Sequence, residues 1–406
     1  MNAPLPTTTL RAVQAADLAA LPLIEKWVSF ASVSRDSNLP IIEWTRTLLE
    51  DQGIECHLTY DDSGKKANLW ATLPAFDGES KTGGLVLSGH TDVVPVDGQP
   101  WDTDPFAAQV IGDKLYGRGV TDMKSYGATA LMMVPELLRR KLKRPVHLAF
   151  SYDEEVGCIG VRRLIADMVE RGYKPAGCIV GEPTGMQVVI AHKGKHAYKT
   201  SVRGFEAHSS LTPQGVNAVE IACEFVTRLK SMHRRLVAEG PFDPIYDVPH
   251  TTIHTGVIAG GTALNIIPRD CEVTWEIRHH HMNSPVLLFN EAKEFADSLV
   301  PAMQAVAPDT GITHKLNSVL PGFATDADSE IARLCFQCAG VDASSGAGKV
   351  SFGTEAALFH QVGVPTIVCG PGHIAQAHQP NEWVTLEQLA WCERFMRRLA
   401  DEICIN

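Results

Sequence analysis

The order of the predicted strands and helices divides the chain into two kinds of structure. Up to residue 184, apolar runs of strand length, such as ANLWATL, GLVLSGH and PVHLAFSY, alternate with segments of helical spacing. This alternation is typical of βαβ units that build a largely parallel sheet. From residue 320 the same pattern resumes with DSEIARLCFQCAG and VPTIVCG. We therefore expect one α/β domain formed by residues 1–184 and 320–406.

Residues 185–319 follow a different pattern. The segment VVIAHKGKHAYKTSVRG alternates as a half-exposed antiparallel strand does, and a long helix, two strands, a second long helix and a last strand follow it. This β-α-β-β-α-β order is that of a ferredoxin-like α+β unit. A chain of 406 residues is long enough for two cores. The sequence thus predicts a small domain inserted into the larger one.

Composition and charge exclude several classes of function. The net charge is −11, from 47 acidic residues against 36 Lys and Arg, which argues against nucleic acid as the main partner. No stretch approaches 18 apolar residues, and the N-terminal segment lacks the basic and apolar regions of a signal peptide. The ten cysteines are scattered, and the only CxxC, Cys335 to Cys338, lies in a predicted helix. We expect core thiols and a reducing cytoplasm.

Carboxylates and imidazoles follow the predicted strands at five separate places. In an open parallel sheet, binding sites form outside the carboxyl ends of the strands. Each residue alone has an ordinary explanation: an Asp at a helix start is commonly a cap, and a lone His is more often a surface or core residue. Their joint occurrence predicts a pair of Zn²⁺-like ions held by two imidazoles and three carboxylates, with one carboxylate bridging. The residues at these places are His90 and Asp92, Asp122, Glu154 and Glu155, Glu182, and His373 and His378.

Three acidic residues in a row, Asp153, Glu154 and Glu155, end the apolar run HLAFSY. Neighbouring carboxylates repel each other in a cleft, and a divalent cation compensates one of them while leaving another free to transfer protons. Adjacent residues that leave a strand point in different directions. One glutamate can therefore bind a metal ion while the other faces a water molecule.

Six motifs resemble, in order and spacing, those of the M20 metallopeptidase family: SGHTDVVPVDGQPW, LYGRGVTDMK, DEEVGC, GEPT, GFEAHSS and AHQPNE. They run from about residue 88 to residue 384. Within the family the likeness is closest to the acetylornithine deacetylases, near the succinyl-diaminopimelate desuccinylases. The resemblance implies hydrolysis of N2-acetyl-L-ornithine to L-ornithine and acetate, in arginine biosynthesis. Other N-acyl amino acid amidohydrolases and di- or tripeptidases of the family are the alternatives.

The resemblance also implies which residues bind the two metal ions. His90 and Glu182 would hold one ion, Glu155 and His378 the other, and Asp122 would bridge them. Zn²⁺ is the ion we expect, with Co²⁺ as an alternative, because both accept nitrogen and oxygen ligands.

Three further roles concern catalysis. Asp92 would orient His90, and Glu154 would be the general base that takes a proton from water and gives it to the leaving amine. His208, in the inserted domain, would reach the active site of a partner subunit and stabilise the oxyanion. The resemblance thus implies a homodimer formed through the inserted domain.

The expected substrate-binding residues lie in three segments. Asn265 and the guanidinium of Arg278 suit a substrate carboxylate. Gly353 and Thr354 offer backbone amides at a helix start, and Glu355 would face the ammonium group of ornithine.

Two other classes of protein are weighed against the hydrolase. A non-catalytic binding protein of the same fold would have lost metal ligands, and all five are present together with Glu154. A structural site with a single metal ion would not need Glu154 beside Glu155. The three consecutive histidines at 279–281 cannot all face one ion, and we interpret them as a surface feature of the inserted domain.

Overall fold

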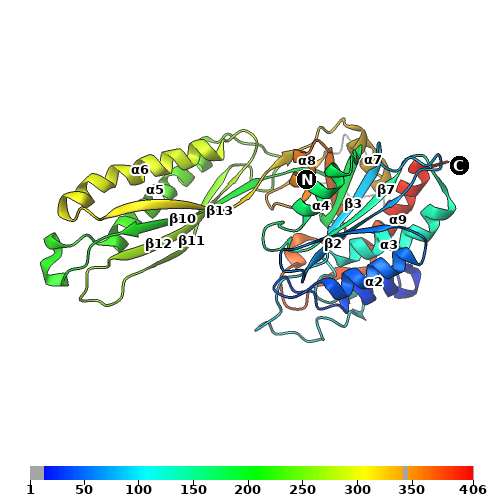
Figure 1. Ribbon diagram of the computed structural model, residues 1–406, viewed down its shortest axis with the longest axis horizontal. Helices are drawn as coiled ribbons and strands as arrows, with labels where there is room; N and C mark the ends of the chain where they lie inside the picture. The colour runs from blue at the N-terminus through cyan, green and yellow to red at the C-terminus, as the bar shows by residue number, and fades with distance from the viewer. Residues whose placement is uncertain (1–12, 342–345, 406) are drawn as a thin grey trace. The chain divides into compact units, whose positions relative to one another are not determined.

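A computed structural model describes residues 13–341 and 346–405, which form two compact units (Figure 1). The larger unit consists of the chain up to Ile190, of Thr325–Gly348, and of the chain from Thr354 onward. The smaller unit consists of Ala191–Ala324 and of the short segment Lys349–Gly353. The sequence pattern had placed the two boundaries at 184/185 and 319/320, and it had assigned the short segment to the α/β domain.

A nine-stranded sheet forms the centre of the larger unit. Its strand order is β1-β2-β7-β3-β8-β16-β9-β14, with β15 beside β9, and the four central strands β7, β3, β8 and β16 run parallel. This confirms the predicted mixed, mostly parallel sheet. The strands are β1 (Cys56–Tyr60), β2 (Ala67–Leu73), β3 (Leu85–His90), β7 (Val146–Ser151), β8 (Gly177–Pro183), β9 (Val189–His192), β14 (Phe323–Ala324), β15 (Gly348–Val350) and β16 (Thr366–Gly370).

Helices cover this sheet, and two small sheets lie beside it (Figure 1). The helices are α1 (Leu21–Val28), α2 (Leu39–Glu50), α3 (Lys124–Arg139), α4 (Val161–Glu170), α7 (Glu330–Ala339), α8 (Ala356–Gln361) and α9 (Leu386–Ile403), with the 3₁₀ turns η1 (Ala15–Asp17) and η4 (Ile374–Gln376). The small sheets are β17 (Trp383–Thr385) with β5 (Lys114–Tyr116) and β4 (Gln109–Ile111), and β18 (Cys404–Ile405) with β6 (Lys141–Leu142).

The alternation of side chains along β3 decides which face of the sheet carries the polar groups. Leu85 and Leu87 belong to the large apolar core that includes residues of α1, α3 and α9. Successive side chains of a strand point to opposite faces, so Ser88 and His90 point the other way. Ser88 there donates a hydrogen bond to Glu355, the residue before α8. The polar site therefore forms on the α8 face, at the carboxyl ends of the parallel strands.

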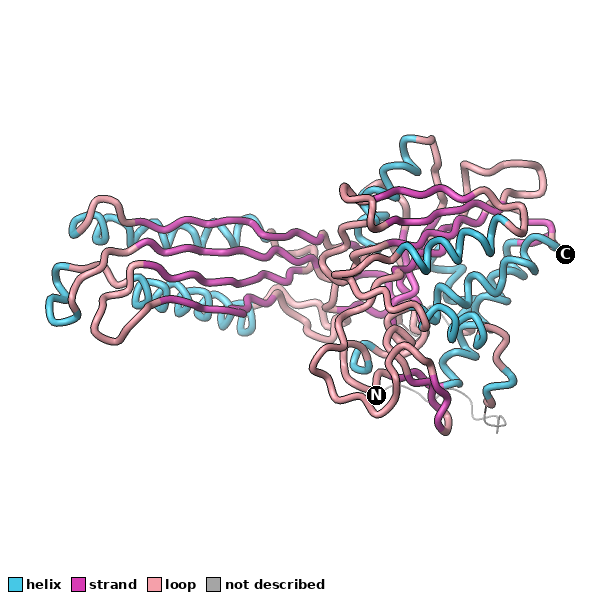
Figure 2. Tube along the Cα trace, turned by 60° about the horizontal axis from the view of Figure 1, so that its bottom comes forward, coloured by secondary structure: helices cyan, strands magenta, loops and turns pink. Residues whose placement is uncertain are grey.

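The smaller unit has the predicted ferredoxin-like order. Its four antiparallel strands lie in the order β11-β12-β10-β13, and Figure 2 shows them side by side with two long helices behind them. Val273, Trp275 and Ile277 of β12 pack with Phe225 of the first long helix in an apolar core. The elements are β10 (Gly194–Arg203), η2 (Ser209–Gln214), α5 (Ala218–Glu239), β11 (Thr252–Gly260), β12 (Asp270–His279), α6 (Pro285–Val306) and β13 (Gly311–Leu320).

The histidines at 279–281 differ from the surface feature that the sequence suggested. His280 is only 1% exposed, and its Nε2 lies 3.1 Å from the carbonyl oxygen of Pro241. The interpretation of all three as surface residues is wrong for His280, whose ring contacts the carbonyl of Pro241 and stacks on the ring of Tyr246.

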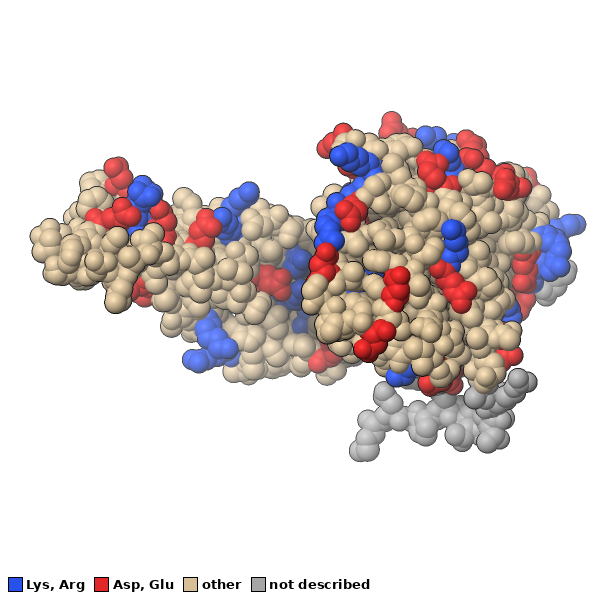
Figure 3. Space-filling model, turned by 90° about the horizontal axis from the view of Figure 1, so that it is seen from below, with Lys and Arg blue, Asp and Glu red and all other residues tan. Residues whose placement is uncertain are grey.

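The state of the cysteines and the distribution of surface charge agree with what the composition suggested. All ten cysteines are free, and Cys335 and Cys338 are buried in the core, as predicted. On the face drawn in Figure 3, Lys and Arg side chains are interspersed with Asp and Glu side chains. Among residues 13–341 and 346–405, no helix is both long enough and apolar enough to span a membrane.

Candidate metal centre

Six acidic and histidine side chains converge at the carboxyl ends of the parallel strands of the larger unit. Three strands and two loops supply them: the end of β3, the turn after β7, the end of β8, the loop before α3 and the loop after η4. We call this set the acid–histidine cluster. Its members are His90, Asp122, Glu154, Glu155, Glu182 and His378.

Asp122 lies between the two imidazoles of the cluster. Its Oδ1 is 3.0 Å from Nε2 of His90, and its Oδ2 is 3.1 Å from Nε2 of His378. Glu182 approaches His90 at 3.8 Å, and Glu155 approaches Nε2 of His378 at 3.0 Å. The cluster thus contains two histidine–glutamate pairs that share one aspartate, which is the grouping expected for two metal ions.

The donor atoms of the cluster fit divalent cations. Two sets of three residues, His90 with Glu154 and Glu182, and His90 with Asp122 and Glu155, each place ligand atoms within 4.8 Å of one another. The second set contains His90 where the family pattern has His378, whose side chain is half exposed. Imidazole nitrogen and carboxylate oxygen are the ligands that Zn²⁺ and related ions accept.

The electrostatics of the cluster also favour bound cations. Burial, followed by repulsion from neighbouring carboxylates, raises the pKa of Glu154 to about 8 and that of Glu155 to about 7. The same two causes raise the pKa of Glu182 well above its ordinary value. For Asp122, burial opposes ionisation, but hydrogen bonds to His378 and His90 hold the pKa below its ordinary value. The cluster crowds more carboxylates together than its imidazoles can compensate, and cations relieve such repulsion.

The tautomer of His90 also suits a metal ligand. Its Nδ1 lies 2.8 Å from the backbone carbonyl oxygen of Asp92. A carbonyl oxygen only accepts hydrogen bonds, so Nδ1 carries the proton. Nε2 lies 3.0 Å from Oδ1 of Asp122 and donates to it while it also carries a proton; loss of that proton on binding a cation would leave Nε2 as the ligand atom, with Nδ1 still held by the carbonyl.

The carboxylate of Asp92 has a different set of contacts from the one predicted. It is 3.6 Å from Nδ1 of His90, and the backbone carbonyl of Asp92 makes the shorter contact. The carboxylate instead accepts hydrogen bonds from the backbone amides of Glu154 (3.1 Å) and Glu155 (3.3 Å) and from the hydroxyl of Ser34 (2.7 Å). Asp92 therefore orients His90 through its backbone and the acidic turn through its side chain.

Cys158 is a residue of the site that sequence reasoning missed. Its Sγ lies 3.0 Å from Oε1 of Glu154, and the side chain is 2% exposed. The thiol donates to the carboxylate and holds one of its oxygens in place. The sequence offered one indication of this contact: Cys158 lies four positions after Glu154, within the motif DEEVGC.

Glu355 is fully buried in the larger unit. Its Oε1 accepts a hydrogen bond from Ser88 at 2.6 Å, and its Oε2 accepts one from Ser151 at 2.7 Å. Ser88 lies on β3 and Ser151 ends β7, the two strands that lead to His90 and to the acidic turn. Both oxygens of the carboxylate therefore contact serines. The prediction had placed this carboxylate against the ammonium group of a substrate instead.

The remaining predicted site residues lie partly in the smaller unit. His208 and Asn265 are on paired loops there, because the amide of Ser209 donates to the carbonyl oxygen of Asn265 at 3.1 Å. Arg278 donates from Nε to Glu276 at 2.7 Å. Gly353 belongs to the smaller unit and Thr354 to the larger one. Their roles in substrate binding stay predictions.

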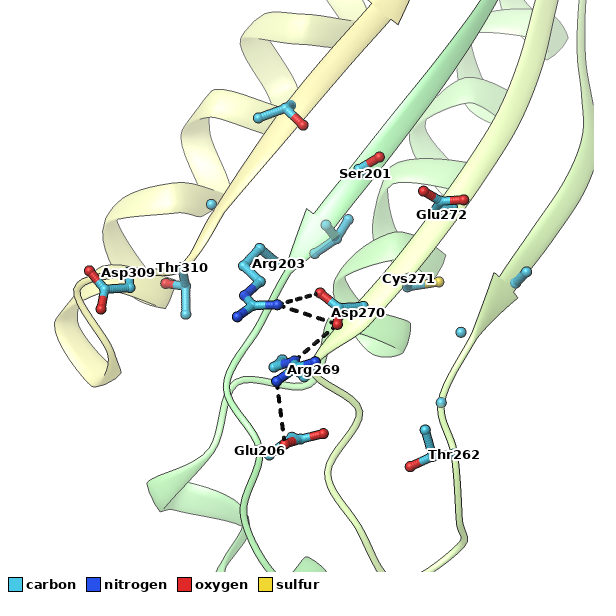
Figure 4. A pocket seen from close by; sticks show the side chains of 16 residues that line it. Ser201, Arg203, Glu206, Thr262, Arg269, Asp270, Cys271, Glu272, Asp309 and Thr310 are labelled. Carbon is cyan, nitrogen blue, oxygen red and sulfur yellow. Dashed lines mark hydrogen bonds and ion pairs between the residues drawn. The ribbon is translucent and has the colours of Figure 1, made fainter.

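The smaller unit also holds a pocket of about 580 Å³ at one end of its sheet (Figure 4). Two arginines line it, and both are paired: Arg203 with Asp270 at 3.0 Å, and Arg269 with Asp270 at 3.0 Å and Glu206 at 3.9 Å. These pairs are exposed and compensate each other's charge. The pocket contains none of the acid–histidine cluster, which lies in the larger unit.

Comparison with known proteins extends this picture. The family model described as Peptidase family M20/M25/M40 matches residues 86–402. An acetylornithine deacetylase of Proteus mirabilis (strain HI4320) is 32% identical over 370 residues, which cover 91% of each chain. An acetylornithine deacetylase of Photorhabdus laumondii is 31% identical over 381 residues, which cover 93% of this chain and 94% of the relative.

Solved structures share the fold at lower sequence identity. A tripeptidase from Staphylococcus aureus superposes with a TM-score of 0.74 at 18% identity, covering 95% of this chain and 98% of the other. A Bacillus subtilis protein described as a dinuclear metal binding peptidase superposes with a TM-score of 0.67 at 14% identity and the same coverage. Both likenesses concern the fold.

Proposed function

Because the chain belongs to peptidase family M20/M25/M40, we propose that it is a metal-dependent hydrolase that converts N2-acetyl-L-ornithine to L-ornithine and acetate, in arginine biosynthesis. The observation that carries the hydrolase is the buried Asp122, with one imidazole at each carboxylate oxygen. The acetyl-ornithine substrate rests on relatives of about 32% identity over most of the chain, which are named acetylornithine deacetylases.

The cluster would hold two divalent cations, with Zn²⁺ as the proposed ion and Co²⁺ as the alternative. His90 and Glu182 would hold one, His378 and Glu155 the other, and Asp122 would be shared by both. Divalent cations held there would supply Lewis-acid polarisation of the amide carbonyl and a lower pKa for water. The proton on Nδ1 of His90, held by the backbone of Asp92, keeps Nε2 free as a ligand.

Glu154 moves the proton in this proposal. Its carboxylate takes a proton from the attacking water as the new C–O bond forms, and it gives that proton to the amine nitrogen as the C–N bond breaks. Cys158 holds one carboxylate oxygen, and Asp92 holds the backbone amide of Glu154. These two contacts orient the carboxylate toward the cluster and limit its rotation.

The smaller unit would supply the remaining groups. We propose a homodimer through this unit, in which His208 stabilises the oxyanion in the partner's site, and in which Asn265 and Arg278 bind the substrate carboxylate. The backbone of Gly353 and Thr354 would add amide donors. Glu355 is left out of the substrate site, because both of its oxygens bind serines inside the larger unit.

The experiment is a substrate panel on protein treated with chelator and then given metal ions again. Release of amine is measured for N2-acetyl-ornithine, N-succinyl-diaminopimelate, N-acetyl-methionine and Gly-Gly. We expect turnover to vanish with chelator and to return with Zn²⁺ or Co²⁺, with the highest kcat/KM for N2-acetyl-ornithine. Preference for another amide would overturn the substrate while keeping the mechanism, and turnover that chelator does not affect would overturn the metal mechanism.

A further inference from the structure

A buried carboxylate outside the acid–histidine cluster fixes the backbone at Asp122. Oε1 of Glu382 accepts hydrogen bonds from three backbone amides, those of Gly119 (3.1 Å), Thr121 (2.8 Å) and Asp122 (3.1 Å). Glu382 is 1% exposed. One oxygen that accepts hydrogen bonds from three amides of the same loop leaves this loop little freedom, and the loop carries the aspartate that lies between the two imidazoles.

The other oxygen of Glu382 forms an ion pair that is as deeply buried. Nη1 of Arg118 donates to Oε2 at 2.7 Å, and each side chain is 1% exposed. A buried ion pair is stable only when its partners are fixed in good geometry, because both charges have lost their water. Arg118 is fixed further by the ring of Trp101, whose centre lies 5.1 Å from the guanidinium carbon.

Gln99 extends the chain of contacts to His378. Its Oε1 accepts a hydrogen bond from Nη2 of Arg118 at 2.5 Å, and its Nε2 donates to the carbonyl oxygen of His378 at 3.0 Å. His378 has a φ of 62°, in the left-handed region that few residues other than glycine adopt. The orientation of its backbone therefore depends on contacts of this kind.

The contacts join the two residues whose side chains meet in the site. They run from the amide of Asp122 through Glu382, Arg118 and Gln99 to the carbonyl of His378, and the two side chains at the ends lie 3.1 Å apart. We propose that Glu382, Arg118 and Gln99 are positioning residues that set the distance between Asp122 and His378, and so the affinity for the metal ion at His378. This rests on the proposed metal-binding role of the cluster.

The principal test is Glu382→Gln, with bound metal as the readout. A glutamine of the same size must turn its NH₂ group toward either the guanidinium or the three amides, so donors face donors. Partners behind metal ligands typically change metal affinity by about 10–100-fold when they are mutated. We expect competition with a chromogenic chelator to show one ion bound that much more weakly, and elemental analysis after desalting to show fewer than two ions.

Glu393→Gln is the matched control in the same unit. Glu393 is 4% exposed, its Oε1 accepts from the amide of Ala20 at 2.8 Å, and its Oε2 accepts from Arg397 at 3.0 Å. It is thus another buried glutamate with one backbone amide and one arginine, but it lies on α9 and none of these contacts reaches the cluster. We expect it to lower the melting temperature without changing metal affinity.

Gln99→Glu tests the link to His378 separately and keeps the test decisive where Glu382→Gln does not fold. The substitution keeps an oxygen for Arg118 and places a second oxygen against the carbonyl of His378 instead of a donor. We expect weaker binding of one ion and unchanged binding of the other, with activity recovered at excess Zn²⁺ or Co²⁺. Recovery by metal ions is a property that a merely structural residue does not have.

The outcomes separate this inference from the proposed function. Wild-type protein that binds two ions, with Glu382→Gln and Gln99→Glu binding them as tightly, overturns the positioning role alone. Weaker metal binding in Glu393→Gln to the same extent also overturns it, because the effect then comes from general loss of stability. Wild-type protein that binds no divalent ion overturns the metal centre and this inference together.

Discussion

Charged side chains are arranged differently in the two units of the molecule: they cluster in one and pair in the other. In the larger unit, four carboxylates and two imidazoles are gathered at the ends of parallel strands, and three of them, His90, Asp122 and Glu182, are buried. In the sheet of the smaller unit, charges pair in twos on exposed strands, as Lys199 does with Glu272 at 2.6 Å and Arg203 with Asp270 at 3.0 Å.

The difference follows from how the strands are arranged. Antiparallel neighbours place residues directly opposite each other, as β10 and β12 do at Arg203 and Asp270, so a charge meets its partner within the sheet. Parallel strands bring their carboxyl ends to one edge, where residues from β3, β7 and β8 accumulate without such partners. Carboxylates that the fold leaves uncompensated need cations as counter-ions. The uncompensated cluster therefore points to the larger unit as the place of chemistry.

The strongest test of this comparison is Asp122→Asn, which removes the carboxylate between the two imidazoles. Metal ions contribute several kcal/mol to catalysis, and each 1.4 kcal/mol is a factor of about ten, so we expect turnover to fall by about 10³-fold or more. Elemental analysis should show loss of bound metal. A variant that keeps two ions and most of its turnover would contradict the shared role of Asp122.

Glu154→Gln separates metal binding from proton transfer within the same cluster. The amide cannot accept the proton, so we expect turnover to fall by about 10²–10⁴-fold while the metal content stays near two. Steady-state kinetics with elemental analysis measures both quantities. If this variant keeps substantial activity, Glu154 is not the base, and Cys158 then holds a carboxylate with another role.

His208→Ala asks whether the smaller unit contributes to the chemistry despite its paired charges. Loss of one oxyanion donor typically lowers kcat by about 10²–10³-fold, and we expect that loss with metal content unchanged. A change confined to KM would remove His208 from the oxyanion role. The control is Ser209→Ala on the same exposed loop, which should change kcat little.

Much of the fold was predictable, because the periods of apolar residues differ between the two units. Alternation of strands and helices indicated the mostly parallel sheet, and the β-α-β-β-α-β order indicated the ferredoxin-like unit. The short segment Lys349–Gly353 could not be placed in the smaller unit, since its contacts are made to residues far away in the chain. Lys349, for example, pairs with Asp243 at 2.7 Å.

The cluster itself was predictable from strand ends, but its surroundings were not. Sequence position told us that His90, Glu155 and Glu182 follow neighbouring strands. It did not tell us that Glu382 and Arg118, separated by 264 positions, form a buried pair. The resemblance suggested that the carboxylate of Asp92 orients His90. Sequence position could not show that the backbone carbonyl of Asp92 makes the shorter contact. Contacts between distant or main-chain groups leave no local pattern.

Glu355→Gln sharpens the comparison through pH. Burial raises the pKa of Glu355, and hydrogen bonds from Ser88 and Ser151 offset this only in part. A carboxyl group whose pKa is raised in the folded protein contributes stability below its unfolded pKa and loses that contribution as pH rises through the folded pKa. We therefore expect the melting temperature of the metal-loaded variant, relative to wild type, to improve as the pH rises above 4.5, the ordinary pKa of a glutamate. A difference that does not change with pH would contradict a buried, ionising Glu355.

The smallest effect is expected where charges are already paired. Arg203→Met removes one exposed partner of Asp270, which keeps its contact with Arg269. Exposed pairs contribute about 0–1 kcal/mol, so the free energy of unfolding should change by no more than that, and metal content and kcat should equal those of wild type. Urea unfolding and steady-state kinetics measure these quantities. A large loss of kcat would mean that the pocket at this end of the sheet takes part in catalysis, and the division of chemistry between the two units would then be wrong.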